Sequence, residues 1–183
     1  MKFIITIALV FLINIYTNAQ AKLFTKTGNI SFFSKTNIEN ISARNNKVLA
    51  VWELASGKIE FSVLMKGFEF EKALMQEHFN EDYVESDKYP KASLKAVIEN
   101  SNIIVLTTDK NYTAKINGTL TMHGVTKEVS TTATIKVKAG VASATAVLTV
   151  LLSDYNIKIP AVVADNINKK IDISINIPAF KAL

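Results

Sequence analysis

The chain contains no cysteine. This absence excludes disulfide bridges, thiol catalysis, thiolate metal sites and attachment of a lipid to a cysteine behind a leader segment. A chain without disulfides must be stabilised by its hydrophobic core, and 183 residues are enough to build one. We therefore expect a fold whose stability comes from packing.

Proline and glycine are also scarce, with 3 prolines and 6 glycines in the chain. After residue 21 no repeat, low-complexity linker or second compositional zone interrupts the sequence. Domain boundaries usually fall in linkers that are rich in such residues. The sequence therefore predicts one domain, over residues 22–183.

Neither sign of charge is strongly in excess, since 21 basic and 16 acidic residues give a net charge of +5. The basic residues stand singly or in pairs, and they form no continuous basic stripe. A nucleic-acid-binding domain usually carries such a stripe. We therefore expect no nucleic acid among the partners of this protein.

The one long hydrophobic run lies at the N-terminus. Lys2 precedes it, residues 3–15 are apolar apart from Thr6 and Asn14, and small residues follow. A membrane-spanning helix needs ~20 apolar residues, whereas this arrangement is typical of a secretory signal. The sequence predicts a signal peptide over residues 1–21, cleaved after Ala19 or Ala21. The alternative is an uncleaved anchor; after cleavage no stable membrane span remains.

Most of the remaining chain alternates between apolar and polar residues. Such alternation predicts β-strands with one face buried, and it is clearest at residues 59–65, 92–98, 114–122, 129–137 and 171–177. Residues 55–58, 123–124 and 139–140 have the composition of hairpin turns. Many strands with short connections indicate an antiparallel sheet, which is either a closed barrel or a sandwich.

Two segments interrupt the alternation. Residues 72–83 place Leu74, Met75, His78, Phe79 and Tyr83 on one stripe, which predicts a short amphipathic helix. Residues 153–166 lose the alternation and predict a second helical or turn segment. Both would lie at a rim of the sheet, where they could cover an opening.

Small residues are frequent on the faces that are expected to be buried. Ala92, Ala96, Gly118 and Ala133 stand there beside larger Leu, Ile, Met and Phe residues. An eight-stranded barrel can either be filled by side chains or hold one small ligand. The residues alone leave both possibilities open, and a filled interior is the simpler of the two.

Two stretches resemble the YceI-like family. They are residues 74–92, in which the helix runs through a Tyr-Pro turn into a strand, and the hairpin at 118–129 with its Gly-x-Leu-Thr start. The resemblance implies an all-β fold with short helices, namely an antiparallel, lipocalin-like eight-stranded β-barrel with a capping helix. It also implies a periplasmic or secreted protein. Residues 103–108 are an apolar piece that the resemblance does not place.

The same resemblance implies that the barrel holds a long apolar amphiphile in a tunnel, for transport or storage in the bacterial envelope. The ligand would be a polyisoprenoid, an isoprenoid quinone or a fatty-acid derivative. Alternation joined to the family fold places these residues on the ligand: Phe61, Val63, Met65, Leu74, Met75, Phe79, Leu94, Ala96, Ile116, Leu120, Ile135, Leu148, Ile173 and Ile175.

Catalytic and metal-binding patterns are weak. The only histidines are His78, expected to bond to backbone or a carboxylate at the helix, and His123, expected as an exposed turn residue. No Gly-x-Ser-x-Gly nucleophile turn occurs. We therefore expect no catalytic residue, no metal and no cofactor. An enzyme acting on the lipid and a filled barrel with a structural or interaction role are the alternatives. A homodimer is plausible if one rim exposes Ile157, Ile159, Val162 and Val163.

Overall fold

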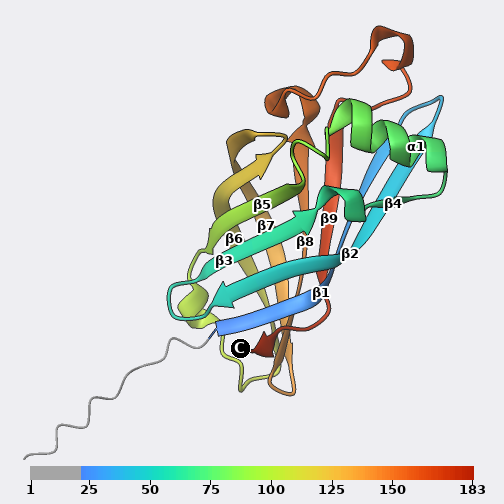
Figure 1. The fold of residues 1–183 in the computed structure, drawn as a ribbon. Helices are drawn as coiled ribbons and strands as arrows, with labels where there is room; N and C mark the ends of the chain where they lie inside the picture. Colours follow the sequence, from blue (N-terminus) through green and yellow to red (C-terminus); the bar gives the residue numbers. More distant parts are fainter. Residues whose placement is uncertain (1–21) are drawn as a thin grey trace, which may run out of the picture.

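The computed structural model describes residues 22–183, and the expected signal peptide lies outside the described residues. Strands dominate the fold, and one short helix stands at one end (Figure 1). The strands are β1 (Lys22–Lys35), β2 (Asn40–Glu53), β3 (Lys58–Leu64), β4 (Glu69–Phe70), β5 (Lys91–Ile98), β6 (Lys110–Met122), β7 (Val125–Lys138), β8 (Val141–Leu151), β9 (Lys170–Ile177) and β10 (Lys181–Ala182).

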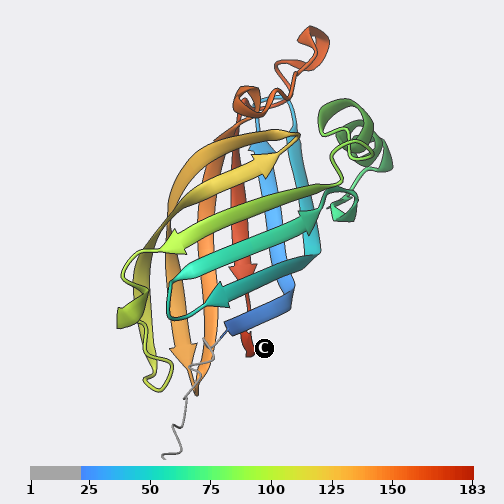
Figure 2. The ribbon, with the colours of Figure 1, turned by 60° about the vertical axis from the view of Figure 1, so that its left-hand side comes forward.

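The sheet closes on itself because β1 pairs with β9 on one side and with β2 on the other. Around the barrel the strands follow the order β1, β2, β3, β5, β6, β7, β8, β9, and all neighbours are antiparallel. The two-residue strands β4 and β10 are additions to β2 and β1. The expected eight-stranded antiparallel barrel is confirmed, and the sandwich is excluded (Figure 2).

The two ends of the barrel differ. The upper end carries the helix α1 (Ala73–His78) and the β1–β2 and β6–β7 turns (Figure 1). The lower end carries the β2–β3 and β7–β8 turns and the C-terminus (Figures 1 and 2). The expected hairpin turns are confirmed. In both His123-Gly124 and Ala139-Gly140 the two residues have φ between 49° and 78°, the left-handed pair that suits the twist of a tight hairpin.

The irregular faces of the first strand follow from a break in register. Between Thr25 and Ile30 the pairing of β1 with β2 shifts twice around Gly28. A side chain at Gly28 would come within 2.6 Å of Ile177 Cδ1. The bulge bends β1, so that its lower part pairs with β10 and its upper part with β9.

The lower half of the barrel is filled. Trp52 is fully buried and meets the ring of Phe180 edge-on, with 5.6 Å between the ring centroids. Ile135, Ile177 and Ala50 are buried as well. The filled interior is therefore the correct description of this half.

The unplaced apolar segment at 103–108 closes the lower end. It begins at the last residue of the 3-10 turn η3 (Ser101–Ile103), and Ile104 is buried in the core. The amide of Val105 donates to the Tyr112 hydroxyl at 3.1 Å, and that hydroxyl lies 3.3 Å from the Val105 carbonyl. The segment is thus bonded to β6 rather than placed at a ligand mouth.

The two interruptions of the alternation are short helical segments at the upper end. Residues 73–83 form α1 followed by a π-helical turn, η2 (Phe79–Tyr83). The second segment holds two 3-10 turns, η4 (Leu152–Tyr155) and η5 (Ala161–Val163). Their expected rim positions are confirmed.

A substitution at Gly118 tests how closely β5 and β6 approach each other. A Cβ there would lie 2.2 Å from the Lys95 carbonyl oxygen and 2.5 Å from Ala96 Cα, which are backbone atoms that a rotamer change cannot move. We expect Gly118→Ala to lower the free energy of unfolding by about 3 kcal/mol, measured by urea denaturation. Thr113→Ala, on the exposed face of the same strand, should change it by less than about 0.5 kcal/mol. Equal stabilities would contradict the steric argument.

Candidate functional site

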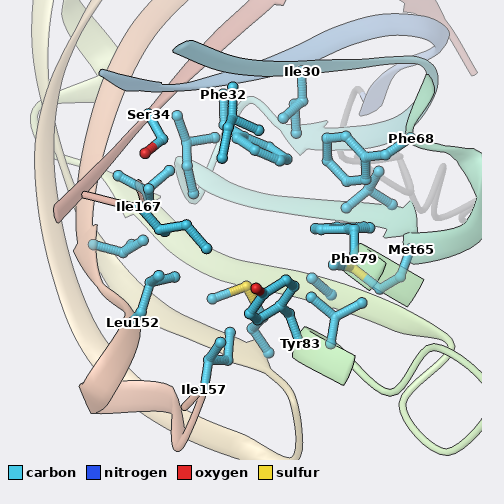
Figure 3. A pocket seen from close by; sticks show the side chains of 18 of the residues that line it. Ile30, Phe32, Ser34, Met65, Phe68, Phe79, Tyr83, Leu152, Ile157 and Ile167 are labelled. Atoms are coloured by element: carbon cyan, nitrogen blue, oxygen red, sulfur yellow. The ribbon is translucent and has the colours of Figure 1, made fainter. Parts of the chain in front are cut away.

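The upper half of the barrel is hollow. It encloses a cavity of about 250 Å³ whose wall is almost entirely apolar. Side chains from β1, β3, β5, β6, β8 and β9 point into it, and residues of α1, η2 and the 152–167 segment cover it (Figure 3). The cavity reaches solvent at the upper rim, where exposed His78 belongs to its wall.

Most of the residues that the sequence proposed as ligand contacts lie on this wall. They are Phe61, Val63, Met65, Met75, Phe79, Leu94, Leu120, Leu148, Ile173 and Ile175. Contact of these residues with a ligand stays a prediction.

The other proposed contacts lie elsewhere. Ala96, Ile116 and Ile135 are buried in the filled lower half, and Leu74 is 60% exposed on the outer face of α1. Leu94 pairs with Leu120 at the level of the cavity, whereas Ala96 pairs with Gly118 one step lower. Alternation predicts correctly which face of a strand is buried, but it carries no information about depth along the barrel.

A cluster of four phenylalanines covers one side of the cavity. Phe32, Phe68, Phe70 and Phe79 have ring centroids 5.0 to 5.8 Å apart in five contacting pairs. The cluster fixes η2 against β1 and β4, and all four rings belong to the cavity wall. Sequence analysis identified Phe79 alone, because Phe68 and Phe70 lie in a stretch without regular alternation.

The 152–167 segment covers the opposite side of the cavity. Leu152, Ile157 and Ile167 point inward in Figure 3, and Val163 also belongs to the wall. Ile157 is 6% exposed, whereas Val162 is 91% exposed. The set suggested for a dimer is thus divided between the inside and the outside, and a homodimer stays a prediction.

One carboxylate links the β1–β2 turn, the start of α1 and the 152–167 segment at the mouth of the cavity. Glu39, in the β1–β2 turn, accepts from Lys72 Nζ at 3.2 Å through one oxygen and from Asn166 Nδ2 at 3.4 Å through the other. Close by, the amide of Asn168 donates to the buried Ser34 hydroxyl at 2.8 Å. The rim is therefore held by a few polar contacts above an apolar wall.

The β7–β8 ladder stops below the rim. Its last pair is Ala133 with Ala146, although both strands continue upward. The turn η4 contacts both strands there, and Tyr155 is 2% exposed. Above the last pair the Thr131 hydroxyl donates to the Val147 carbonyl oxygen at 2.6 Å, so the two strands stay side by side while η4 packs against them.

His123 holds that turn in place. Its Nδ1 lies 2.8 Å from the Tyr155 carbonyl oxygen, its Nε2 lies 3.5 Å from Glu85 Oε1, and the Tyr89 ring meets it edge-on. A hydrogen bond from Lys88, together with the charge of Lys88, holds the pKa of the Glu85 carboxyl below its ordinary value. The side chain of His123 is only 9% exposed, so the expectation of an exposed turn residue is wrong.

The described residues offer little for catalysis or metal binding. Within residues 22–183, no group of three or more His, Asp or Glu side chains is arranged to hold a metal ion. In the same part of the chain no helix is long and apolar enough to cross a membrane. The arrangement can enclose an apolar chain, with polar groups confined to its mouth.

Solved structures with this fold come from several bacteria. A polyisoprenoid-binding domain from Saccharophagus degradans, implicated in plant cell wall breakdown, has a TM-score of 0.78 at 12% identity, over 90% of this chain and 99% of that one. BcnA from Burkholderia cenocepacia has a TM-score of 0.68 at 15% identity, over 84% and 96%. The YCEI protein of Campylobacter jejuni has a TM-score of 0.58 at 20% identity, over 81% and 88%.

At these identities the structures show a shared fold. No curated protein sequence matches the chain. The model of one protein family, described as the YceI-like domain, matches residues 17–179. With that match over most of its length and a closed barrel of the same architecture, the chain belongs to the YceI-like family.

Proposed function

We propose that this protein binds a long apolar amphiphile in the upper cavity and carries or stores it in the bacterial envelope. The observation that carries the proposal is the enclosed apolar cavity, open at one end beside a polar rim. The Saccharophagus degradans domain, described as polyisoprenoid-binding, supports a polyisoprenoid as the ligand. An isoprenoid quinone and a fatty-acid derivative are the other ligands that the apolar cavity would accept. A signal peptide over residues 1–21 would deliver the protein to the periplasm or outside the cell.

Burial of apolar surface supplies the affinity. Each Å² of ligand surface removed from water contributes about 25 cal/mol, and a ligand also restores contacts that an empty apolar cavity lacks. The cavity of about 250 Å³ is near the lower limit of ~300 Å³ for small-molecule pockets. A long chain must therefore spread the wall or extend through the mouth, where its polar head would meet Glu39, Lys72 and Asn166.

Binding explains the site better than catalysis does. In the described part of the chain, the two ring nitrogens of His123 face a backbone carbonyl and a carboxylate, and no serine or threonine hydroxyl bonds to them. His78 is the one histidine on the cavity wall, and one imidazole without an orienting partner is a poor acid–base pair. The hollow upper half also argues against the alternative of a filled barrel with a purely structural role.

Native mass spectrometry tests the proposal directly. Residues 22–183, which contain every strand of the barrel, are purified from a bacterial host and weighed before and after solvent extraction. We expect an added mass that extraction identifies as an isoprenoid or acyl lipid. Because a bound ligand stabilises the folded state by mass action, the extracted protein should melt at a lower temperature. An apo mass and no uptake of added isoprenoid quinone would refute the proposal.

Filling the cavity should reduce binding. Ala92 is buried on the wall of β5 beside the mouth, so Ala92→Trp places an indole in the ligand space. We expect at least about a tenfold loss of affinity for an isoprenoid quinone, equivalent to ~1.4 kcal/mol, measured by fluorescence titration. Lys91→Trp, one residue earlier on the exposed face of the strand, is the matched control and should bind normally. Equal affinities in the two variants would place the ligand elsewhere.

The Glu39 contacts should control exchange of the ligand. Glu39→Ala removes both oxygens that hold Lys72 and Asn166, whereas Glu39→Gln keeps an acceptor for Asn166. We expect the alanine variant to release a preloaded fluorescent fatty acid at least about threefold faster, with an intermediate rate for the glutamine variant, in stopped-flow transfer to vesicles. Unchanged release rates would show that the mouth contacts do not limit exchange.

A further inference from the structure

Three strongly exposed apolar side chains lie on the segments that frame the cavity mouth. Ile38, in the β1–β2 turn, is 66% exposed; Leu74, in α1, is 60% exposed; Val162, in η5, is 91% exposed. These segments are separate in sequence and gather at the upper end of the barrel (Figures 1 and 2). Each places one apolar side chain in water beside the opening.

The exposed side chains continue the apolar surface of the cavity. Met75 follows Leu74 along the chain, and Val163 follows Val162, and both of these neighbours belong to the cavity wall. On two of the three segments, therefore, one apolar residue faces the cavity and its neighbour faces solvent. An apolar chain leaving the cavity would pass from the inner to the outer residues with little exposure to bulk water.

The arrangement fits a lipid bilayer better than a protein. A specific protein interface covers about 800 Å² on each partner as a continuous, complementary patch. These side chains instead stand one each on three segments that are joined by the polar contacts of Glu39 with Lys72 and Asn166. A bilayer accepts separate apolar anchors one by one, and binding grows with the apolar area inserted. Lys158, which is exposed on the 152–167 segment, can extend its amine to headgroup phosphates.

We propose that the upper rim docks on a lipid bilayer through Ile38, Leu74 and Val162, which places the cavity mouth against the membrane. The ligand would then pass between bilayer and cavity at the docked rim. This reason for docking rests on the proposed function, but docking itself is measurable on vesicles without a ligand. The acidic residues Glu71 and Asp165 share the rim segments with the lysines, so the attraction is mainly apolar and extends to uncharged membranes.

The lower end of the barrel supplies a matched control. Ile103, Val105 and Val141 are 56%, 45% and 45% exposed there, and they do not line the cavity. The rim variant is Ile38→Ser with Leu74→Ser and Val162→Ser, and the control variant is Ile103→Ser with Val105→Ser and Val141→Ser. All six positions are exposed, so thermal melting should confirm that both variants stay folded.

Flotation with vesicles separates the two variants. We expect residues 22–183 to float with vesicles of phosphatidylcholine and with mixed phosphatidylethanolamine and phosphatidylglycerol. The rim variant should bind at least about tenfold more weakly, and the control variant should bind like the parent. Absence of flotation, or equal losses in both variants, would overturn the docking proposal. A parent that dimerises through the rim without floating would instead assign this surface to a second copy.

A tryptophan reporter measures insertion at one position. The chain has one tryptophan, Trp52, which is fully buried, so Val162→Trp adds a signal at the rim. We expect its emission to shift to the blue with vesicles and to be quenched by brominated lipids, whereas Ile103→Trp should not respond. Identical responses would exclude oriented docking. Vesicle binding without any extractable ligand would contradict the proposed function alone, and a bound ligand without vesicle binding would contradict the docking alone.

Discussion

The pairing of β1 with both β2 and β9 is the constraint on which the rest of the structure depends. Without it the sheet would have two free edges and no enclosed interior. The bulge around Gly28 makes the double pairing possible, because it bends β1 between the lower strands and the upper ones. Closure fixes the width of the barrel, so side-chain size alone then decides which part of the interior is filled.

Side-chain size changes along the barrel axis in a consistent way. In the lower half, Trp52, Ile135 and Phe180 fill the space between small residues, and the 101–108 segment closes the end. In the upper half, the wall residues leave about 250 Å³ unfilled. A cavity of this kind forfeits contacts and is costly to a small domain. In a chain without cysteine, the filled half supplies the stability that allows the other half to stay hollow.

The sequence predicted more of the fold than of the candidate site. Strict alternation and left-handed turn residues such as His123-Gly124 predicted the strands and hairpins, because both are local properties of the chain. Ala96 and Ile116 were placed on the ligand because they share a face with Leu94 and Leu120. Their depth depends on the stagger of the strands around the barrel, which is set by long-range pairing. Phe68 and Phe70 were missed because their stretch shows no period.

The mouth illustrates why the site cannot be read from one segment. Glu39 contacts residues that are distant from it in sequence, Lys72 and Asn166, so its role exists only once the barrel has closed. The three segments that it joins also cover the cavity and carry the exposed side chains of Ile38, Leu74 and Val162. A change that loosens the Glu39 contacts would therefore alter both the access to the cavity and the positions of these exposed side chains. The proposed ligand exchange and the proposed docking on a bilayer would therefore depend on the same few polar contacts, which do not involve the filled lower half.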